Sequence, residues 1–150
     1  MKIYLATDHA GFTLKEKVKE FLQTEGCEVI DCGAYAYDKN DDYPDFIVKA
    51  ASEVSKDPKN NRGVVFGGSG QGEAMVANKY KNVRAVVYYG GETKIISLSR
   101  EHNNANVLSI GARFVDEKEV LEVVKQWLET PFSNEERHMR RIEKINKIEC

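Results

Sequence analysis

The apolar residues of this chain alternate between two patterns, short continuous runs and longer helical repeats. The short runs, bounded by turn residues, predict strands at residues 2–7, 28–32, 63–66, 83–89 and 107–112. In the first helical repeat, Leu14, Val18, Phe21 and Leu22 recur at helical spacing before Gly26 ends the pattern. Similar spacing predicts helices at residues 13–24, 45–55, 73–81, 92–100, 116–129 and 134–147.

Strands that alternate with helices predict an α/β domain with a parallel sheet and helices on both faces. We find no internal repeat, low-complexity segment or linker, so residues 1–150 are expected to form a single domain. Ser133 and Glu136 have the spacing of a capping box, which places the start of the last helix near residue 134.

The last predicted helix has an unusual apolar pattern. Met139, Ile142, Ile145 and Ile148 form a narrow stripe of residues three apart, and most of the other positions are charged. Two interpretations remain open, namely a solvated surface helix or an arm that packs against a second subunit.

Composition narrows the class of protein. The chain is 41% hydrophobic and 31% charged, with a formal net charge of −2, which predicts neither nucleic-acid nor membrane binding. It contains no stretch of 18 apolar residues, and its first residues do not resemble a signal peptide. The three cysteines, Cys27, Cys32 and Cys150, include no CxxC pair and are predicted to be free thiols. We therefore expect a cytoplasmic protein without a zinc site.

The stretch VVFGGSGQGE, residues 64–73, is the strongest candidate for a functional site. It has neither the lysine of a nucleotide-binding P-loop nor the glycine spacing of a dinucleotide fingerprint. Glu73 would lie in the first turn of the following helix, where it would repel a bound pyrophosphate. A helix start favours the charged form of a carboxylate, which predicts a low pKa for Glu73.

This arrangement is better suited to enediolate chemistry. The backbone N–H groups of Gly68 to Gly72 can converge on an oxyanion, while Glu73 takes a proton from the carbon beside a carbonyl. The Ser69 hydroxyl can carry a proton between neighbouring oxygens. The alternative is a tight strand-to-helix turn in which Glu73 only complements the helix dipole.

Two more polar groups follow strands at the same edge of the predicted sheet. Asp8 and His9 follow the first strand, and Tyr43 lies after the second, so these side chains can face the pocket of Glu73. Each also has a purely structural interpretation. Asp8 can cap a helix, His9 can lie in a surface turn, and Tyr43 can cap the helix that begins near Pro44.

A third polar group precedes the fifth strand and therefore lies at the opposite edge of the sheet. His102 and Asn103 belong to it, so a catalytic His102 would have to serve the active site of a partner subunit. Alternatively, the asparagines of this segment adopt left-handed conformations in a loop. On the last helix, Arg137 and Arg141 share a face and can bind a phosphate, or they can pair with nearby glutamates.

Five motifs in this order span nearly the whole chain: TDHAG, DYPD, GGSGQGEAMVANK, SREHNNANVLSIGAR and ERHMRR. Together they resemble the ribose-5-phosphate isomerase type B family, which includes galactose-6-phosphate and allose-6-phosphate isomerases. The resemblance implies a Rossmann-like three-layer α/β/α fold with a five-stranded sheet. It also implies aldose–ketose isomerisation of a sugar phosphate through a cis-enediolate, without metal or cofactor, in a homodimer or homotetramer with shared active sites.

The resemblance also assigns roles to residues of this chain. Glu73 would be the base, His102 would assist opening of the sugar ring, and Tyr43 would line the sugar site beside Asp8. The anion hole would consist of Ser69 and the N–H groups of Gly70 and Gly72, supported by Asn103. The phosphate would be held by His9, Arg137 and Arg141, with Arg113 close to the sugar or phosphate.

One departure from the family pattern concerns the base. Many relatives begin the glycine loop with a catalytic cysteine, whereas this chain has Gly67 there and Glu73 at the end of the loop. It therefore resembles the branch of the family that uses a glutamate. The expected substrates are ribose 5-phosphate and ribulose 5-phosphate. The alternatives are a hexose-phosphate isomerase and a non-catalytic module that binds phosphosugars.

Overall fold

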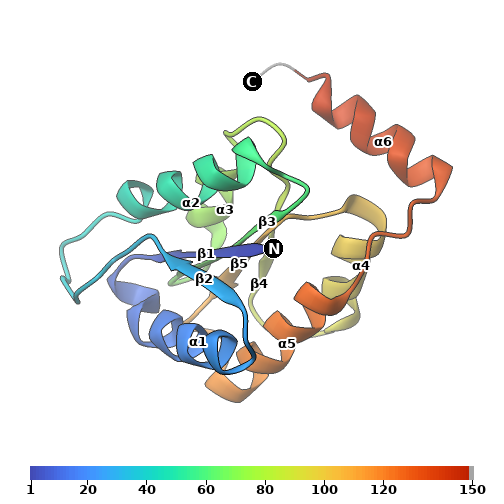
Figure 1. Cartoon of the computed structure of the whole chain (residues 1–150). Helices are drawn as coiled ribbons and strands as arrows, with labels where there is room; N and C mark the ends of the chain where they lie inside the picture. The colour runs from blue at the N-terminus through green and yellow to red at the C-terminus, as the bar shows by residue number, and fades with distance from the viewer. Residues whose placement is uncertain (149–150) are drawn as a thin grey trace.

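The computed structural model describes residues 1–148, which form a three-layer α/β/α structure (Figure 1). The central sheet is entirely parallel and has five strands in the order β2-β1-β3-β5-β4. The strands are β1 (Lys2–Thr7), β2 (Glu28–Asp31), β3 (Asn61–Gly67), β4 (Ala85–Tyr88) and β5 (Val107–Gly111). The predicted fold class is confirmed.

Helices cover both faces of the sheet. The helices are α1 (Phe12–Thr24), α2 (Pro44–Lys56), α3 (Gln71–Ala77), α4 (Lys94–Asn103), α5 (Glu117–Glu129) and α6 (Glu136–Asn146). Helices α1, α4 and α5 enclose one apolar core that includes Trp127, and α2 and α3 enclose the other, which includes Ile47 (Figure 1). Alternate residues of β1 enter the two cores, Leu5 on one face and Tyr4 on the other, as expected for a strand covered on both sides.

The order of the strands creates a position for a site between β1 and β3. These two strands pair from Lys2 with Asn61 to Thr7 with Phe66. After β1 the chain moves outward to β2, and after β3 it moves to the other half of the sheet. The loops that leave β1 and β3 therefore separate at their carboxyl ends, where doubly wound sheets bind ligands.

Two predicted boundaries were wrong. Helix α3 ends at Ala77 rather than near residue 81, because the Asn78 side chain exchanges two hydrogen bonds with the backbone of Ala85 and directs the chain toward β4. Helix α6 begins at Glu136, and Ser133 is not its N-cap. Asn134 has a left-handed φ of 56°, so the chain turns before the helix starts.

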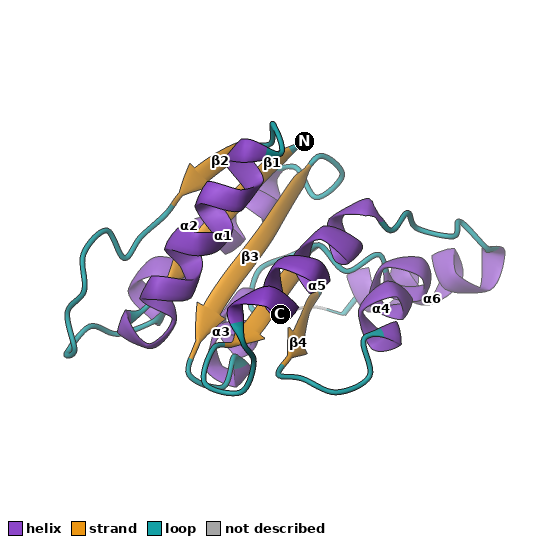
Figure 2. Ribbon diagram, turned by 90° about the horizontal axis from the view of Figure 1, so that it is seen from below, coloured by secondary structure: helices purple, strands orange, loops and turns teal. Residues whose placement is uncertain are grey.

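Helix α6 lies at the periphery, beside α4 and away from the sheet (Figures 1 and 2). Its apolar stripe is largely uncovered, since Met139 and Ile145 are each 46% exposed and Ile148, just beyond the helix, is 68% exposed. Cys27 and Cys32 are free thiols, and the prediction for Cys150 lies outside the described residues. No helix in residues 1–148 combines the length and apolarity that a membrane span requires.

Candidate active site

A cavity of about 350 Å³ lies at the carboxyl ends of β1 and β3. It is lined by side chains and backbone from the loops after β1, β2, β3 and β5. The lining residues are Asp8, His9, Ala10, Tyr43, Gly68, Ser69, Gly72, Glu73 and Arg113. Apart from Ala10, each of these was a candidate from the sequence. The structure therefore brings together the groups that were expected at this edge of the sheet.

The carboxylate of Glu73 occupies the space of a side chain at Gly67. A Cβ atom at Gly67 would overlap both carboxylate oxygens and the carboxyl carbon of Glu73. Gly67 is the last residue of β3, and Glu73 is the third residue of α3, so the glycine loop folds the helix start back over the strand end. The absence of a side chain at position 67 is what admits the glutamate to this place.

Glu73 is buried, with 4% of its surface exposed. Burial raises the pKa of the Glu73 carboxyl, and the negative charge of Asp8 acts in the same direction, while the backbone N–H of Glu73 itself opposes them. The low pKa expected for a carboxylate at a helix start was therefore wrong. A raised pKa makes Glu73 a stronger proton acceptor than an exposed carboxylate.

The glycine loop also carries backbone N–H groups near this carboxylate. Gly70 adopts a left-handed φ of 76°. Its carbonyl accepts a 2.6 Å hydrogen bond from the hydroxyl of Ser109, which joins the loop to β5. Among residues 1–148, the N–H groups of Ser69 and Gly70 have no hydrogen-bond partner. Gly72 packs against the Tyr43 ring, and a Cβ atom there would lie 2.7 Å from the Tyr43 hydroxyl.

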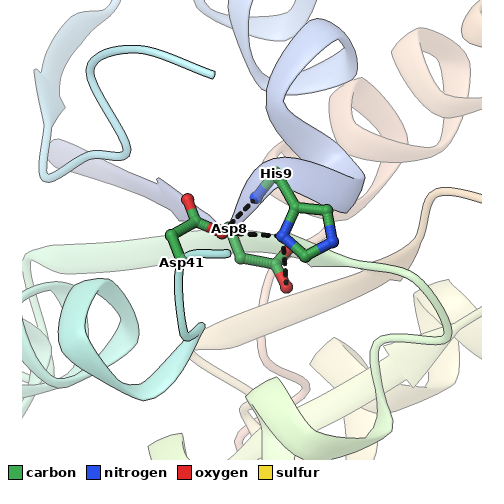
Figure 3. Close-up of side chains that lie close together, drawn as sticks. All are labelled: Asp8, His9 and Asp41. Carbon is green, nitrogen blue, oxygen red and sulfur yellow. Dashed lines mark hydrogen bonds and ion pairs between the residues drawn. The ribbon is translucent and has the colours of Figure 1, made fainter. Parts of the chain in front are cut away.

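On the other side of the cavity, Asp8, His9 and Asp41 form a compact group (Figure 3). Asp8 accepts a hydrogen bond from the Ala10 N–H and caps a short 3₁₀ turn, so it is both a cap and a cavity residue. The three side chains offer ligand atoms within 4.8 Å of one another, as a cation site would. The distance from His9 Nδ1 to Asp41 Oδ1 is 2.7 Å, however, so the group forms a hydrogen bond here.

Arg113 brings a positive charge to the same cavity from the loop after β5. Its guanidinium lies against Gly68, where a Cβ atom would be 3.0 Å from one of its terminal nitrogens. The side chain is exposed, and no ion pair holds it within the described part of the chain. It is therefore available to an anion in the cavity.

Five candidates do not line this cavity, namely Gly70, His102, Asn103, Arg137 and Arg141. Gly70 is buried beneath the loop. Asn103 instead borders a larger cleft of about 950 Å³, between the segment from Asn78 to Val86 and the end of α6. The following residue, Asn104, has the left-handed conformation expected of a loop asparagine.

His102 lies in the last turn of α4 and stacks on His138 of α6, with ring centroids 4.3 Å apart. His138 is 2% exposed, and its Nδ1 lies 2.8 Å from the Ser133 hydroxyl. Burial lowers the pKa of His138, and the charges of His102, Arg137 and Arg141 contribute to the effect. His102 therefore contacts a buried imidazole of α6, the helix that also carries the two arginines.

The two arginines of α6 have different surroundings. Arg137 pairs with Glu135 at 2.8 Å, as the simpler interpretation of the last helix expected. Arg141 forms no ion pair within residues 1–148. The prediction that His102 lies away from the pocket of its own chain agrees with its absence from the cavity lining.

Two residues of these groups were missed from the sequence. Asp41 directly precedes the DYPD motif in a turn-rich loop, and its partner His9 is 32 residues away in the sequence. His138 lies within the ERHMRR motif between the predicted phosphate ligands. A buried histidine on an otherwise charged helix is the signal that could have found it.

Comparison with known proteins gives consistent results. A family described as ribose/galactose isomerase matches residues 3–145. Ribose-5-phosphate isomerase B of Mycolicibacterium paratuberculosis is 43% identical, over 99% of this chain and 92% of that protein. The crystal structure of ribose-5-phosphate isomerase B from Mycoplasma genitalium with bound ribulose-5-phosphate superposes with a TM-score of 0.93. It is 40% identical and covers 97% of this chain and 94% of that one.

Proposed function

Because the chain belongs to the ribose/galactose isomerase family, we propose that it interconverts ribose 5-phosphate and ribulose 5-phosphate, with Glu73 as the base. The observation that carries the assignment of the base is the buried Glu73 carboxylate in the space beside Gly67. The likeness to ribose-5-phosphate isomerases B over nearly the whole chain supports the reaction and the substrate.

In the proposed reaction, Glu73 removes the C2 proton of the open-chain aldose and returns it to C1, while the Ser69 hydroxyl, which lines the same cavity, passes the O2 proton to O1. Negative charge then develops on the substrate oxygens, and the free N–H group of Ser69, which lines the cavity, is suited to receive it. The burial that raises the pKa of Glu73 also favours the protonated form that exists after the first transfer. Tyr43 and Asp8 would contact the sugar, and His9 with Arg113 would face its phosphate.

We further propose that His102, Asn103, Arg137 and Arg141 complete the cavity of a second copy of the chain. Two observations support this arrangement. None of these residues lines the cavity of its own chain, and His102 contacts His138 of α6, whose apolar stripe is largely uncovered in the single chain. In the dimer, His102 would assist ring opening, and the arginines would bind phosphate beside His9. The free thiols of Cys27 and Cys32 support a cytoplasmic location.

Glu73→Gln is the substitution that tests the proposed base. The variant keeps the size of the side chain but cannot accept the proton, so we expect kcat to fall about 100- to 10,000-fold. Exchange of the substrate C2 hydrogen with solvent should be lost to the same extent, while binding of ribose 5-phosphate persists. Turnover close to the wild-type value would exclude Glu73 as the base.

The matched control is Glu117→Gln. Glu117 also lies in the first turn of a helix, α5, but it is exposed and does not line the cavity. It should change neither kcat nor KM. If Glu73→Gln abolishes exchange with every sugar phosphate, a module that only binds phosphosugars is excluded as well.

The family description also names galactose, so six-carbon sugar phosphates are the second candidate substrates. The purified chain should be assayed with ribose 5-phosphate, allose 6-phosphate and galactose 6-phosphate under one set of conditions. We expect the largest kcat/KM for the five-carbon substrate. A preference for a six-carbon phosphate would move the assignment to the hexose-phosphate branch.

A further inference from the structure

Asp41 contacts His9 at two points. Its Oδ1 atom accepts a 2.9 Å hydrogen bond from the His9 backbone N–H and lies 2.7 Å from the ring nitrogen Nδ1. The Asp41 side chain is 9% exposed, although the preceding residues 35–40 of the same loop are exposed. Only the end of this long loop is therefore held against the cavity, and Asp41 holds it there.

The hydrogen bond determines how the imidazole is presented. A carboxylate can only accept, so Nδ1 carries a proton and Nε2 is left for another partner. Figure 3 shows Nε2 pointing away from both carboxylates. The backbone contact fixes the start of the side chain and the ring contact fixes its rotation, so that His9 has one orientation at the cavity.

The surroundings of His9 also favour its cationic form. Within residues 1–148, Asp8 contributes a second carboxylate, whose Oδ2 lies 3.9 Å from His9 Nδ1. The positive charge of Arg113 acts against the cationic form of His9. The Tyr37 ring packs edge-on against the imidazole, with ring centroids 6.3 Å apart. The hydrogen bond that His9 donates to Asp41 raises the pKa of the imidazole, although Arg113 and partial burial act to lower it. The Oδ2 atom of Asp41 is buried and has no hydrogen-bond partner in the described chain, so the His9 backbone and ring are the donors that compensate for burial of this side chain.

We propose that Asp41 is a positioning residue, which holds His9 as an oriented imidazolium so that Nε2 donates to the phosphate of the substrate. The proposal rests on the proposed function for the identity of that anion. It assigns Asp41 no contact with the substrate. Its effect is to extend toward higher pH the range in which His9 binds an anion.

The direct test is a titration of the imidazole proton resonances by NMR. The chain contains three histidines, so the His9 resonance can be assigned from its loss in His9→Asn. In Asp41→Asn, the backbone N–H keeps an acceptor but the charge is gone, and His9 should titrate at lower pH than in the wild type. Asp42→Asn, one residue further along the loop and exposed, should leave the titration unchanged. An unchanged His9 titration in Asp41→Asn would overturn the proposal.

The second test measures KM for ribose 5-phosphate as a function of pH. Below both His9 pKa values, wild type and Asp41→Asn should have equal KM, because His9 is charged in both. Between the two values only the wild type keeps the charge, and KM of the variant should rise by up to about tenfold, since a charged hydrogen bond is lost. Above both values the difference should close again, and kcat should change little throughout. A KM increase that is the same at every pH would indicate a merely structural role and overturn the proposal.

A third comparison separates an effect of Asp41 through His9 from a general effect of Asp41→Asn on the cavity. In the His9→Asn background, Asp41→Asn should add no further increase in KM, because Asp41 acts through His9. An additional increase there would contradict the proposal. The NMR titration requires no turnover, so failure of the proposed substrate leaves it intact. If His9 titrates at lower pH in Asp41→Asn, as expected, but the wild type has no activity on ribose 5-phosphate, the proposed function would be wrong and the role of Asp41 toward His9 would stand.

Discussion

A methyl group added at Gly67 should separate the stability of the fold from the position of the base. Gly67→Ala places a Cβ atom on the carboxylate of Glu73, where it would overlap both oxygens. Gly67 ends a β-strand and does not have a left-handed conformation, so the substitution introduces no backbone strain. The obstacle it meets is the far end of a flexible side chain, which can turn aside.

The size of the effect follows from that difference. Moving the carboxylate costs packing, and insertion of a methyl group into a filled site typically destabilises by about 1–3 kcal/mol. We expect the lower end, because the backbone need not move. The loss of activity should be much larger, since general-base catalysis contributes about 100- to 10,000-fold and depends on placement of the base within hydrogen-bond reach. Gly67→Ala should therefore unfold at a slightly lower urea concentration than the wild type, but it should lose at least about 99% of kcat.

The assay compares kcat on ribose 5-phosphate with urea unfolding for Gly67→Ala, Glu73→Ala and the double variant. Removal of the Glu73 carboxylate should restore the stability that Gly67→Ala loses, without restoring activity. Gly63→Ala is the matched control, because Gly63 lies on the same strand and its added Cβ would meet only Val107 and Val54. Wild-type kcat in Gly67→Ala would refute the reasoning, as would fully additive stability losses in the double variant.

Two further predictions concern the shared site and the fold. An equimolar mixture of Glu73→Gln and His102→Asn chains, allowed to exchange subunits, should regain about a quarter of wild-type activity. Half of the dimers would then be mixed, and each mixed dimer would contain one intact site of its two. No recovery after confirmed exchange would count against shared sites. Lys15→Met should lower the free energy of unfolding by about 1–3 kcal/mol, because Lys15 is fully buried and donates to Asp31 and to the Ala34 carbonyl, each at 2.7 Å. The loss stays moderate because Lys19 still pairs with Asp31 at 2.9 Å, and the exposed Lys17→Met should be neutral in the same urea titration.

The periodicity of apolar residues predicted the strands and helices because each element is covered on a defined face. The periodicity did not predict the ends of helices that are determined by a single side-chain contact. Asn78 ends α3 by bonding the backbone of Ala85, and the Ser133 hydroxyl lies beside His138 instead of capping α6. Such contacts join residues that no local pattern connects.

The site was predictable to the extent that topology decides it. The loops after β1 and β3 had to meet at one edge of the sheet, so Asp8, His9 and Glu73 could be expected together. The position of the Glu73 carboxylate, in the space that a side chain at residue 67 would fill, depends on the path of the glycine loop. The contact of Asp41 with His9 depends on how the loop after β2 folds back toward β1. Neither is encoded in the spacing of residues.

The helix start by itself predicted a low pKa for Glu73, and the sequence left open how far desolvation would offset it; in the structure, burial of the side chain raises the pKa. A helix N-terminus stabilises a carboxylate by about 0.3–1 kcal/mol, whereas full burial can shift a carboxyl pKa by several units. Burial therefore outweighs the dipole in a helix of seven residues. In Glu73, burial raises the pKa, whereas the helix dipole would lower it, and burial is the larger of the two effects.

The charges of the cavity would also orient the proposed substrate. Burial and Asp8 favour the neutral form of Glu73, while Asp41 favours the cationic form of His9, so the environments push these two groups in useful directions. A phosphate placed beside Glu73 would meet a buried carboxyl and the nearby charge of Asp8, whereas one placed beside His9 and Arg113 meets two cations. In the proposed function, the phosphate end would therefore be drawn to His9 and Arg113, which would leave the C1–C2 end of the sugar for Glu73 and the free N–H groups of the glycine loop. The Glu73 carboxylate would then remain available as the proposed base, because the anion would be held elsewhere.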